Sequence, residues 1–550
     1  MHSDSTSSAA TAPIAVDIRR FPWIRRLASD YAFAYDRVAD YFAGDPASPQ
    51  AWADAIHRRH AHRGAPDAIA RVVAGQQERR GAPAAARAEA AHLVDPRTVV
   101  IITGQQAGLF GGPLFTLLKA LTAMKLAHQI QRAHGVQVVP VFWIDAEDHD
   151  WPEISGCTIL DAEFDPRIVR LGDLPGAGKL PIARLMLDER ISRAIQDLTG
   201  FLPESGFRDG LIDGLRRAYR PGVSMVEAFG CWVESVLGDR GLVVFDASDP
   251  AAKPIVRDLF ARELSTPGET SRLADEAGQK LVSAGYHSQV TPPDDAVALF
   301  YLNDGREAVR ISDSQATVGE RQVALSALAD EALREPHHFS PNVLLRPLVQ
   351  DTLFPTICYV AGPNELAYLG QLRDIYGHFH VPMPLMYQRA TATIVDSATL
   401  RFLTKYTLPL EALQPQDEAV LNQLLQDQLP PTVEQSISAA AATIEQQMTD
   451  VAAAVPQIDP TLQGVVQSTV GKMQHDLRTL QNKVIQAAKR RDETLRRQFH
   501  RAQALTFPLG HPQEREIGFV WFLNRFGPAL VDRLLDDLPL EMGHHWVLTV

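Results

Sequence analysis

Residues 98–115 read TVVIITGQQAGLFGGPLF, in which a β-branched apolar run leads through a glycine-rich turn into a leucine-rich stretch. The run from Val99 to Ile102 predicts a buried strand. Leucines recur at helical spacing after Pro113, and residues 136–144 form a second apolar run that predicts another strand. This order predicts two parallel strands joined by a right-handed crossover, in a sheet covered on both faces.

Similar runs recur further along the chain. Three of them end in small or polar residues, at residues 242–245, 354–360 and 384–387. Prolines that follow the first two can occupy a first helical turn, where a missing N–H costs nothing. We therefore expect an α/β fold with a doubly wound parallel-sheet core over residues 93–392, with insertions at about 165–240 and 260–340.

The parts on either side of this core have helical patterns. Residues 1–92 predict a helical segment packed on the core. Residues 393–506 contain two heptad-like runs separated by Pro456 and Pro460, which predicts an antiparallel α-helical coiled-coil arm. Residues 507–550 predict a globular segment that returns to the core.

Composition narrows the class of protein. The 550 residues carry a net charge of −13, which argues against a general nucleic-acid binder because such a surface repels phosphates. Three distant cysteines exclude a disulfide framework, and a reducing cytoplasm is the simplest setting. We expect no membrane association, because no stretch approaches the roughly 18–20 apolar residues of a membrane span.

The glycine-rich turn supports two interpretations. Its glycines fit neither G-x-G-x-x-G nor a Walker A loop. They either form a tight packing turn or let an anion approach free N–H groups at a helix N-terminus. The position after a strand favours a ligand site. The candidate substrate-binding residues here are Thr103, Gly104, Gln105, Gln106, Gly108, Gly111, Gly112 and Pro113.

An acidic stretch, IDAEDHD at residues 144–150, follows the next predicted strand. Crowded carboxylates call for a cation, an ammonium group or a proton relay, although a solvated acidic loop is the alternative. His149 and Asp148 are candidates for a catalytic general base. Glu147 and Asp150 are candidates for binding an ammonium group or Mg²⁺.

Two later strand ends add further candidates. The stretch YVAGPNELAY at residues 359–368 places Asn364, Glu365 and Tyr368 at a predicted helix start. Arg389 follows another predicted strand and could grip a carboxylate or phosphate in bidentate fashion. An ordinary surface ion pair is the equally plausible role for this arginine.

Long stretches of the chain resemble the BshC family, the cysteine-adding enzymes of bacillithiol biosynthesis. They are TGQQAGLFGGPLF (103–115), PVFWIDAEDHDWPEI (140–154), LLRPLVQDTLFPTICYVAGPNELAYL (344–369) and PQEREIGFVWFLNRFG (512–527). The resemblance runs in the family's order from about residue 90 to the end. The chain departs from it at Asp145, where a small residue such as glycine is expected.

The resemblance implies a Rossmann-like core with connecting-peptide insertions and a coiled-coil arm that promotes a homodimer. It implies a ligase that joins cysteine to the amine of glucosaminyl-malate, giving bacillithiol. Because an ionised carboxylate is a poor electrophile, we expect activation by ATP or another nucleotide, with Mg²⁺ as a further possibility. A nucleotidyl- or acyl-transferase of similar fold and a non-enzymatic scaffold remain open as alternatives.

Overall fold

The computed structural model describes residues 12–550 except 63, 294, 313, 428–430 and 492. The chain forms two compact units. The core unit comprises the chain up to Ile394 together with Pro512–Val550, and the second unit is Val395–His511.

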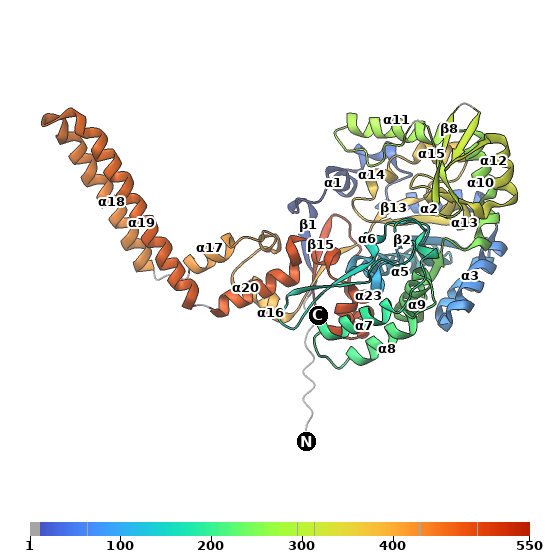
Figure 1. Ribbon diagram of the computed structural model, residues 1–550, viewed down its shortest axis with the longest axis horizontal. Helices are drawn as coiled ribbons and strands as arrows, with labels where there is room; N and C mark the ends of the chain where they lie inside the picture. The colour runs from blue at the N-terminus through green and yellow to red at the C-terminus, as the bar shows by residue number, and fades with distance from the viewer. Residues whose placement is uncertain (1–11, 63, 294, 313, 428–430, 492) are drawn as a thin grey trace, which may run out of the picture. The chain divides into compact units, whose positions relative to one another are not determined.

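A five-stranded parallel sheet lies at the centre of the core unit (Figure 1). Its strands, in spatial order, are β13 (Leu385–Gln388), β12 (Thr356–Ala361), β2 (Val99–Gln106), β3 (Val138–Asp145) and β6 (Val243–Asp246). From β2 the chain adds β3 and β6 on one side and later adds β12 and β13 on the other. The strand order therefore reverses between β2 and β12, and in open α/β sheets ligands bind at such a point.

Both faces of the sheet are buried, which confirms the predicted doubly wound core. Val99 and Ile101 pack with apolar residues of α2 (Pro49–Ala61) and α5 (Leu114–His134). Val100 and Ile102 belong to a larger cluster on the opposite face. The alternation follows from the two-residue period of a strand. Helix α5 connects β2 to β3 and ends at Gly135, whose φ of 65° suits a glycine.

Shorter elements surround this sheet. A β-hairpin and several helices follow β3, and an antiparallel sheet of order β10-β9-β8-β7-β11 follows β6. The elements are α1 (Arg26–Phe33), α3 (Pro66–Arg80), α4 (Ala84–Ala91), α6 (Trp151–Ile154), β4 (Gly156–Leu160), β5 (Pro166–Arg170), α7 (Arg190–Phe201), α8 (Arg208–Ala218), α9 (Met225–Leu237), α10 (Lys253–Ser265), α11 (Glu269–Ser283), β7 (Ala296–Leu302), β8 (Arg306–Ser312), β9 (Gln315–Val318), β10 (Arg321–Ala324), α12 (Leu325–Arg334), β11 (Phe339–Pro341), α13 (Arg346–Leu353), α14 (Leu366–Leu369) and α15 (Arg373–Phe379).

The C-terminal segment is built into the core unit. It forms α21 (Gln513–Glu516), α22 (Phe519–Phe526), α23 (Ala529–Asp537) and β15 (His544–Thr549), and β15 lies between β1 (Ile14–Asp17) and β14 (Thr391–Val395). The side-chain amide of Gln513 exchanges hydrogen bonds with both backbone groups of Ile394, at 2.7 and 2.8 Å. These bonds fix the segment beside the point where the chain leaves the core unit.

The second unit is helical, and it contains the predicted antiparallel coiled-coil arm. Its long helices are α18 (Pro431–Ala454) and α19 (Gln463–Arg491), which lie side by side in Figure 1. The turn between them contains Asp459, whose carboxylate accepts a hydrogen bond from Thr461 N–H at 2.9 Å. The remaining helices are α16 (Ser397–Lys405), α17 (Ala419–Asp427) and α20 (Glu493–Thr506). None of the described helices has the length and apolar character needed to cross a membrane.

Candidate functional site

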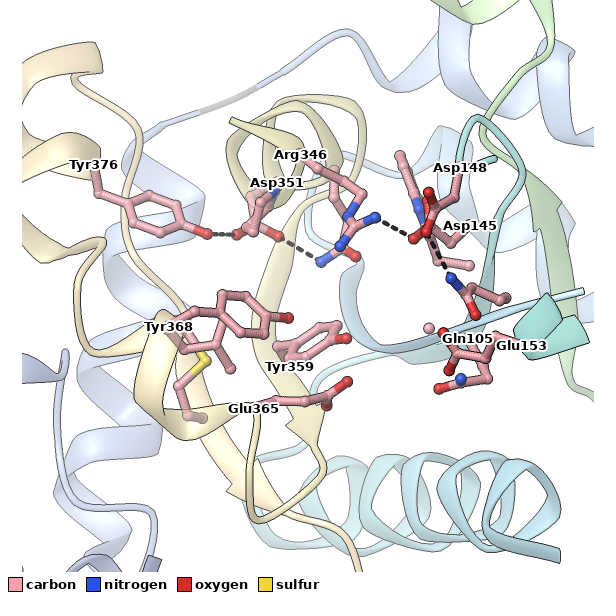
Figure 2. Close-up of a pocket in the computed structure, with 17 residues that line it drawn as sticks. Gln105, Asp145, Asp148, Glu153, Arg346, Asp351, Tyr359, Glu365, Tyr368 and Tyr376 are labelled. Carbon is pink, nitrogen blue, oxygen red and sulfur yellow. Dashed lines mark hydrogen bonds and ion pairs between the residues drawn. The ribbon is translucent and has the colours of Figure 1, made fainter. Parts of the chain in front are cut away.

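A cavity of about 190 Å³ opens at the carboxyl ends of β2, β3 and β12, beside the point where the strand order reverses (Figure 2). Of the residues singled out in the sequence, six line it: Gly104, Gln105, Gln106, Asp148, Glu365 and Tyr368. Its other walls include Trp143, Asp145, Glu153, Arg346, Pro347, Gln350, Asp351, Tyr359, Leu369, Tyr376 and Met386. β2 continues to Gln106, so the two glutamines stand at the end of a strand rather than in a loop.

Carboxylates dominate the walls of this cavity. Five acidic side chains line it against a single arginine, Arg346. Asp145 is paired with that arginine, and Asp351 accepts a hydrogen bond of 2.5 Å from the hydroxyl of Tyr376. Figure 2 shows both contacts, with Tyr359, Tyr368 and Glu365 facing the same space. A lining of this kind favours a ligand that carries a positive charge and hydrogen-bond donors.

Asp148 is held as an ionised group. Its carboxylate accepts hydrogen bonds of 2.6 Å from the side chain of Gln106 and 2.7 Å from the N–H of His149. Burial raises the pKa of Asp148, but these bonds and the charge of Arg306 outweigh it, so the pKa lies below its ordinary value. A carboxylate so stabilised is a weak base.

His149 does not line the cavity. Its side chain is 49% exposed, and Nδ1 lies 3.5 Å from Oδ1 of Asp148. The structure therefore brings the sequence-predicted pair together but leaves the imidazole on the outside of the acidic loop. Asp150 is also exposed, and it caps α6 by accepting a hydrogen bond from Glu153 N–H at 3.3 Å.

Glu153 is one of the cavity carboxylates, with Asp145 and Asp351, that sequence reasoning did not single out as site residues. Although Glu153 is exposed as a residue, the partial burial of its carboxyl group, followed by the charges of Asp150 and Asp148, raises its pKa. Among the described residues it takes part in no ion pair, unlike Asp145 and Glu365. A raised pKa and a carboxylate outside any of these ion pairs suit a group that takes up a proton. The spacing Asp150-x-x-Glu153 is a helix-start pattern, and it was the available signal that Glu153 lies one turn beyond the acidic loop.

Lys119 is another residue that the sequence interpretation missed. This lysine of α5 is 2% exposed, and its ammonium donates to three acceptors. They are the carbonyl oxygen of Gly104 at 2.8 Å, Oε1 of Gln105 at 3.2 Å and Oε1 of Glu365 at 2.8 Å. A lone lysine inside the apolar run LFTLLKALTAM was the visible signal, because lysine is almost never buried without partners.

The glycines of the second half of the turn serve packing. A Cβ on Gly111 would lie 2.2 Å from the Phe519 ring, and one on Gly108 would lie 2.9 Å from Cα of Gly112. Gly112 and Pro113 bridge to the C-terminal segment, where Phe519 N–H donates to the carbonyl of Gly112 at 3.1 Å. None of these four residues lines the cavity. They lie away from the cavity because they pack closely against the C-terminal segment, which is distant in sequence.

The same turn does not fit a bound phosphate. The N–H groups of Gly108, Gly111 and Gly112 donate to backbone carbonyls within the turn, at 2.9–3.1 Å. Leu114 N–H donates to the carbonyl of Ile517 at 2.8 Å. The expectation that this loop cradles an anion therefore needs correction, because these donors already have partners.

Three more predicted residues have structural partners. Thr103 is fully buried, and its hydroxyl donates to the carbonyl of Val360 at 2.9 Å. Glu147 accepts hydrogen bonds from Lys253 at 2.5 Å and from Ser340 at 3.0 Å, both in a buried setting. The sequence suggested that Glu147 binds an ammonium group or Mg²⁺. The structure corrects this prediction, because Glu147 is already bonded to Lys253 and Ser340. Across the described residues, no cluster of three or more metal-ligating side chains is arranged to hold a metal ion.

Arg389 already holds a carboxylate of the protein itself. Its guanidinium forms two hydrogen bonds with Glu514, at 2.7 and 2.9 Å, and the two side chains are 3% and 6% exposed. An ion pair, the alternative that the sequence left open, is what the structure contains, but the pair is buried and not at the surface. Asn364 lies with Arg389 in a separate small cavity and not with Glu365 in the larger one.

Comparison with known proteins supplies independent information. The model described as "Bacillithiol biosynthesis BshC, N-terminal Rossmann-like domain" matches residues 14–390, and the one for the BshC "C-terminal coiled-coil domain" matches residues 392–550. The chain is 33% identical over 531 residues to the "Putative cysteine ligase BshC" of Salinibacter ruber, with 95% of each chain covered. It is 31% identical to the Symbiobacterium thermophilum protein of the same name, with 96% of this chain and 98% of the other covered.

Proposed function

The chain belongs to the BshC family of bacillithiol biosynthesis, and we propose that it is a ligase that joins cysteine to glucosaminyl-malate through an amide bond. The relatives named above carry the cysteine-ligase name over nearly their full length. The specific acceptor, glucosaminyl-malate, and the final place of this step in the pathway are parts of the proposal.

The observation that carries this proposal is the acidic cavity at the reversal of strand order. Amide formation requires an amine that arrives as an ammonium group and must lose a proton before it attacks. Two of the five carboxylates around this small space are paired with protein cations, Asp145 with Arg346 and Glu365 with Lys119. The negative charge that remains favours the ammonium form on arrival. We propose that the glucosamine ammonium enters this cavity.

Within this proposal, Glu153 accepts the proton. Its raised pKa and its freedom from ion pairs distinguish it from Asp148, whose ionised form is stabilised by Gln106. Gln105 and Glu365 form the walls that orient the amine. His149 and Asp148 remain the sequence-based alternative for the base. The turnover of a His149→Ala variant distinguishes this alternative from Glu153.

The carboxylate of cysteine must be activated, and we propose ATP or another nucleotide as the donor. The glycine turn does not fit a phosphate, so no step is assigned to a donor at that place. A requirement for Mg²⁺ belongs to the same proposal. We place the reaction in the cytoplasm, where the three free cysteines stay reduced.

The arm is proposed to mediate a homodimer. Several apolar side chains of the arm are exposed in the single chain, including Val465 at 58% and Leu480 at 49%. Deletion of residues 432–490 in favour of a short linker would give a monomer by light scattering if the proposal holds. A dimer that survives this deletion would contradict it.

The activity is tested with purified protein, cysteine, glucosaminyl-malate and each candidate donor in turn. Mass spectrometry detects bacillithiol, and omission of cysteine serves as the control. Product that depends on cysteine and on one donor supports the proposal. Adenylate transfer that does not need cysteine favours a nucleotidyltransferase, and no product with any donor contradicts the ligase.

A further inference from the structure

We propose that Lys119 is a positioning residue, whose buried ammonium holds Gln105 and Glu365 in place as the walls that receive the substrate amine. This inference rests on the proposed function for its catalytic consequence. Its structural part, the fixing of two strand ends, stands independently.

The contacts of Lys119 match its bonding capacity. A lysine ammonium has three N–H donors, and here three oxygen atoms accept at 2.8, 3.2 and 2.8 Å. The three acceptors come from two different parts of the sheet edge. Gly104 and Gln105 belong to the end of β2, whereas Glu365 precedes α14 in the loop after β12.

The position of these acceptors places Lys119 at the reversal of strand order. β2 and β12 are neighbours in the sheet, their pairing ends at Thr103 and Val360, and residues just beyond that point line the cavity. Lys119 of α5 links the two strands beyond the end of their pairing. Because Gly104, Gln105 and Glu365 all line the cavity, the link fixes three of its walls at once.

Glu365 is held from a second direction as well. Its Oε2 accepts a hydrogen bond of 2.5 Å from Gly362 N–H, while Oε1 accepts from Lys119. The carboxylate is therefore oriented by both of its oxygens although 28% of the side chain is exposed. Burial lowers the pKa of Lys119, and the charge of Glu365 acts against that effect. Glu365 thus favours the charged form of Lys119.

Removal of this link has consequences that differ from those of general destabilisation. Lys119→Met keeps the length of the side chain but leaves Gln105 without its donor and Glu365 without its cation. We expect Gln105 to become more mobile and Glu365 to be held only by the hydrogen bond from Gly362 N–H, while the sheet stays packed. The loss then appears at the cavity and in the binding of the amine substrate.

The chain offers a matched control in the same helix. Lys125 donates to two backbone carbonyls, those of Asp536 at 2.9 Å and Leu538 at 2.6 Å, and neither acceptor lines the cavity. Lys125→Met therefore removes a hydrogen-bonded, less buried lysine of the same helix without touching the walls. Any effect common to both variants reports on helix stability, and any effect confined to Lys119 reports on the cavity.

The first measurement needs no turnover. Hydrogen–deuterium exchange of peptides covering residues 103–106 and 362–366 should become at least fivefold faster in Lys119→Met and should stay unchanged in Lys125→Met. Unchanged exchange in both peptides would overturn the proposal even if the protein proved to have another activity.

The second measurement separates binding from chemistry. We expect Lys119→Met to raise the KM for glucosaminyl-malate at least tenfold, with the KM for cysteine changed less than twofold. Faster exchange without a change in either KM would overturn the catalytic part. Failure of the wild-type protein to form product would instead contradict the proposed function, while the exchange data still decide the positioning part. Should Lys119→Met not fold, Glu365→Gln removes the same ion pair from its partly exposed side and is judged by the same two measurements.

Discussion

The two halves of the stretch 103–113 differ in what their residues contact. In the first half, Gly104, Gln105 and Gln106 line the acidic cavity. In the second half, Gly108, Gly111 and Gly112 are buried against one another and against the C-terminal segment. The glycines that looked like a ligand loop thus serve mainly as a packing surface, and the amides beside them face the cavity.

This difference shows how one sequence motif can combine two physical requirements. The end of a strand that lines a cavity needs polar side chains. The turn that follows needs glycines, because a side chain there would collide with the C-terminal segment. Residues 108–113 and Arg389 pack against the C-terminal segment, Pro512–Val550. We call these three parts of the chain together the lock. The predictions below test the separation between the lock and the cavity, and they run from the largest expected effect to the smallest.

Gly111→Val should damage the lock most. Gly111 has a φ of +98°, at which a β-branched residue is an outlier, and its added Cβ would lie 2.2 Å from the Phe519 ring. We expect the free energy of unfolding to fall by more than about 4 kcal/mol, the range of exceptional substitutions. Chemical denaturation measures it.

Gly135→Val is the matched control for that experiment. Its φ of +65° brings similar strain, but no atom lies within 4 Å of the added Cβ. We expect a loss of roughly 1–2 kcal/mol from the left-handed conformation alone. Equal losses at the two glycines would show that Phe519 does not restrict the turn.

Arg389→Met tests whether the arginine is part of the lock or of the substrate site. The substitution leaves the buried carboxylate of Glu514 without its cationic partner, which costs about 3–5 kcal/mol. We expect lower stability in thermal denaturation and unchanged KM values for both substrates. Arg389→Met with Glu514→Leu should recover most of the loss, because no buried charge remains. A raised KM at full stability would instead return Arg389 to the substrate-binding role.

His545 makes the lock sensitive to acid. It lies 2.8 Å from the hydroxyl of Thr393, and burial lowers its pKa from 6.5 to about 4. Between these values the unfolded chain binds a proton that the folded chain does not, so stability falls as the pH drops from 6.5 towards 4. The difference of about 2.5 units amounts to about 3 kcal/mol. Urea unfolding at pH 7, 5.5 and 4.5 should show this slope, and His545→Asn should lose it.

Glu153→Gln tests the cavity without touching the lock. Removal of a general base should lower kcat about 100-fold, which is about 2.7 kcal/mol, with little change in melting temperature. Because the pKa of Glu153 is raised, the acidic limb of the rate profile should lie above the ordinary carboxyl range and disappear in the variant. Glu163→Gln, at an exposed position that does not line the cavity, is the control. Full turnover in Glu153→Gln would exclude this residue as the base.

Much of the fold follows from local patterns. Apolar runs placed β2, β3, β12 and β13 within a few residues of their bounds, and heptad spacing indicated the antiparallel arm. The parallel order of β2 and β3 follows from the helix between them. Ligands bind at the carboxyl ends of strands in open α/β sheets, and this rule predicts a cavity at the end of β2 and β12. Gln105, Gln106 and Glu365 are therefore predictable as cavity residues from the sequence.

The rest depended on partners that no local pattern reveals. Arg389 and Glu514 are 125 residues apart, and Lys119 and Glu365 are 246 apart. A charged side chain after a strand looks the same in a sequence whether it faces a ligand or another buried side chain. Glu153 differs from these residues, because a local helix-start pattern in the sequence, Asp150-x-x-Glu153, indicates its position.

The hydrogen bonds between Gln513 and Ile394 have a consequence for protein engineering. They bring the two ends of a 117-residue excursion, Val395–His511, back to one point of the core unit. A linker of a few glycines and serines could therefore close the chain there with little entropic cost. The second unit is, in topological terms, an insertion into the core unit. A foreign domain could replace it at the same point of the chain.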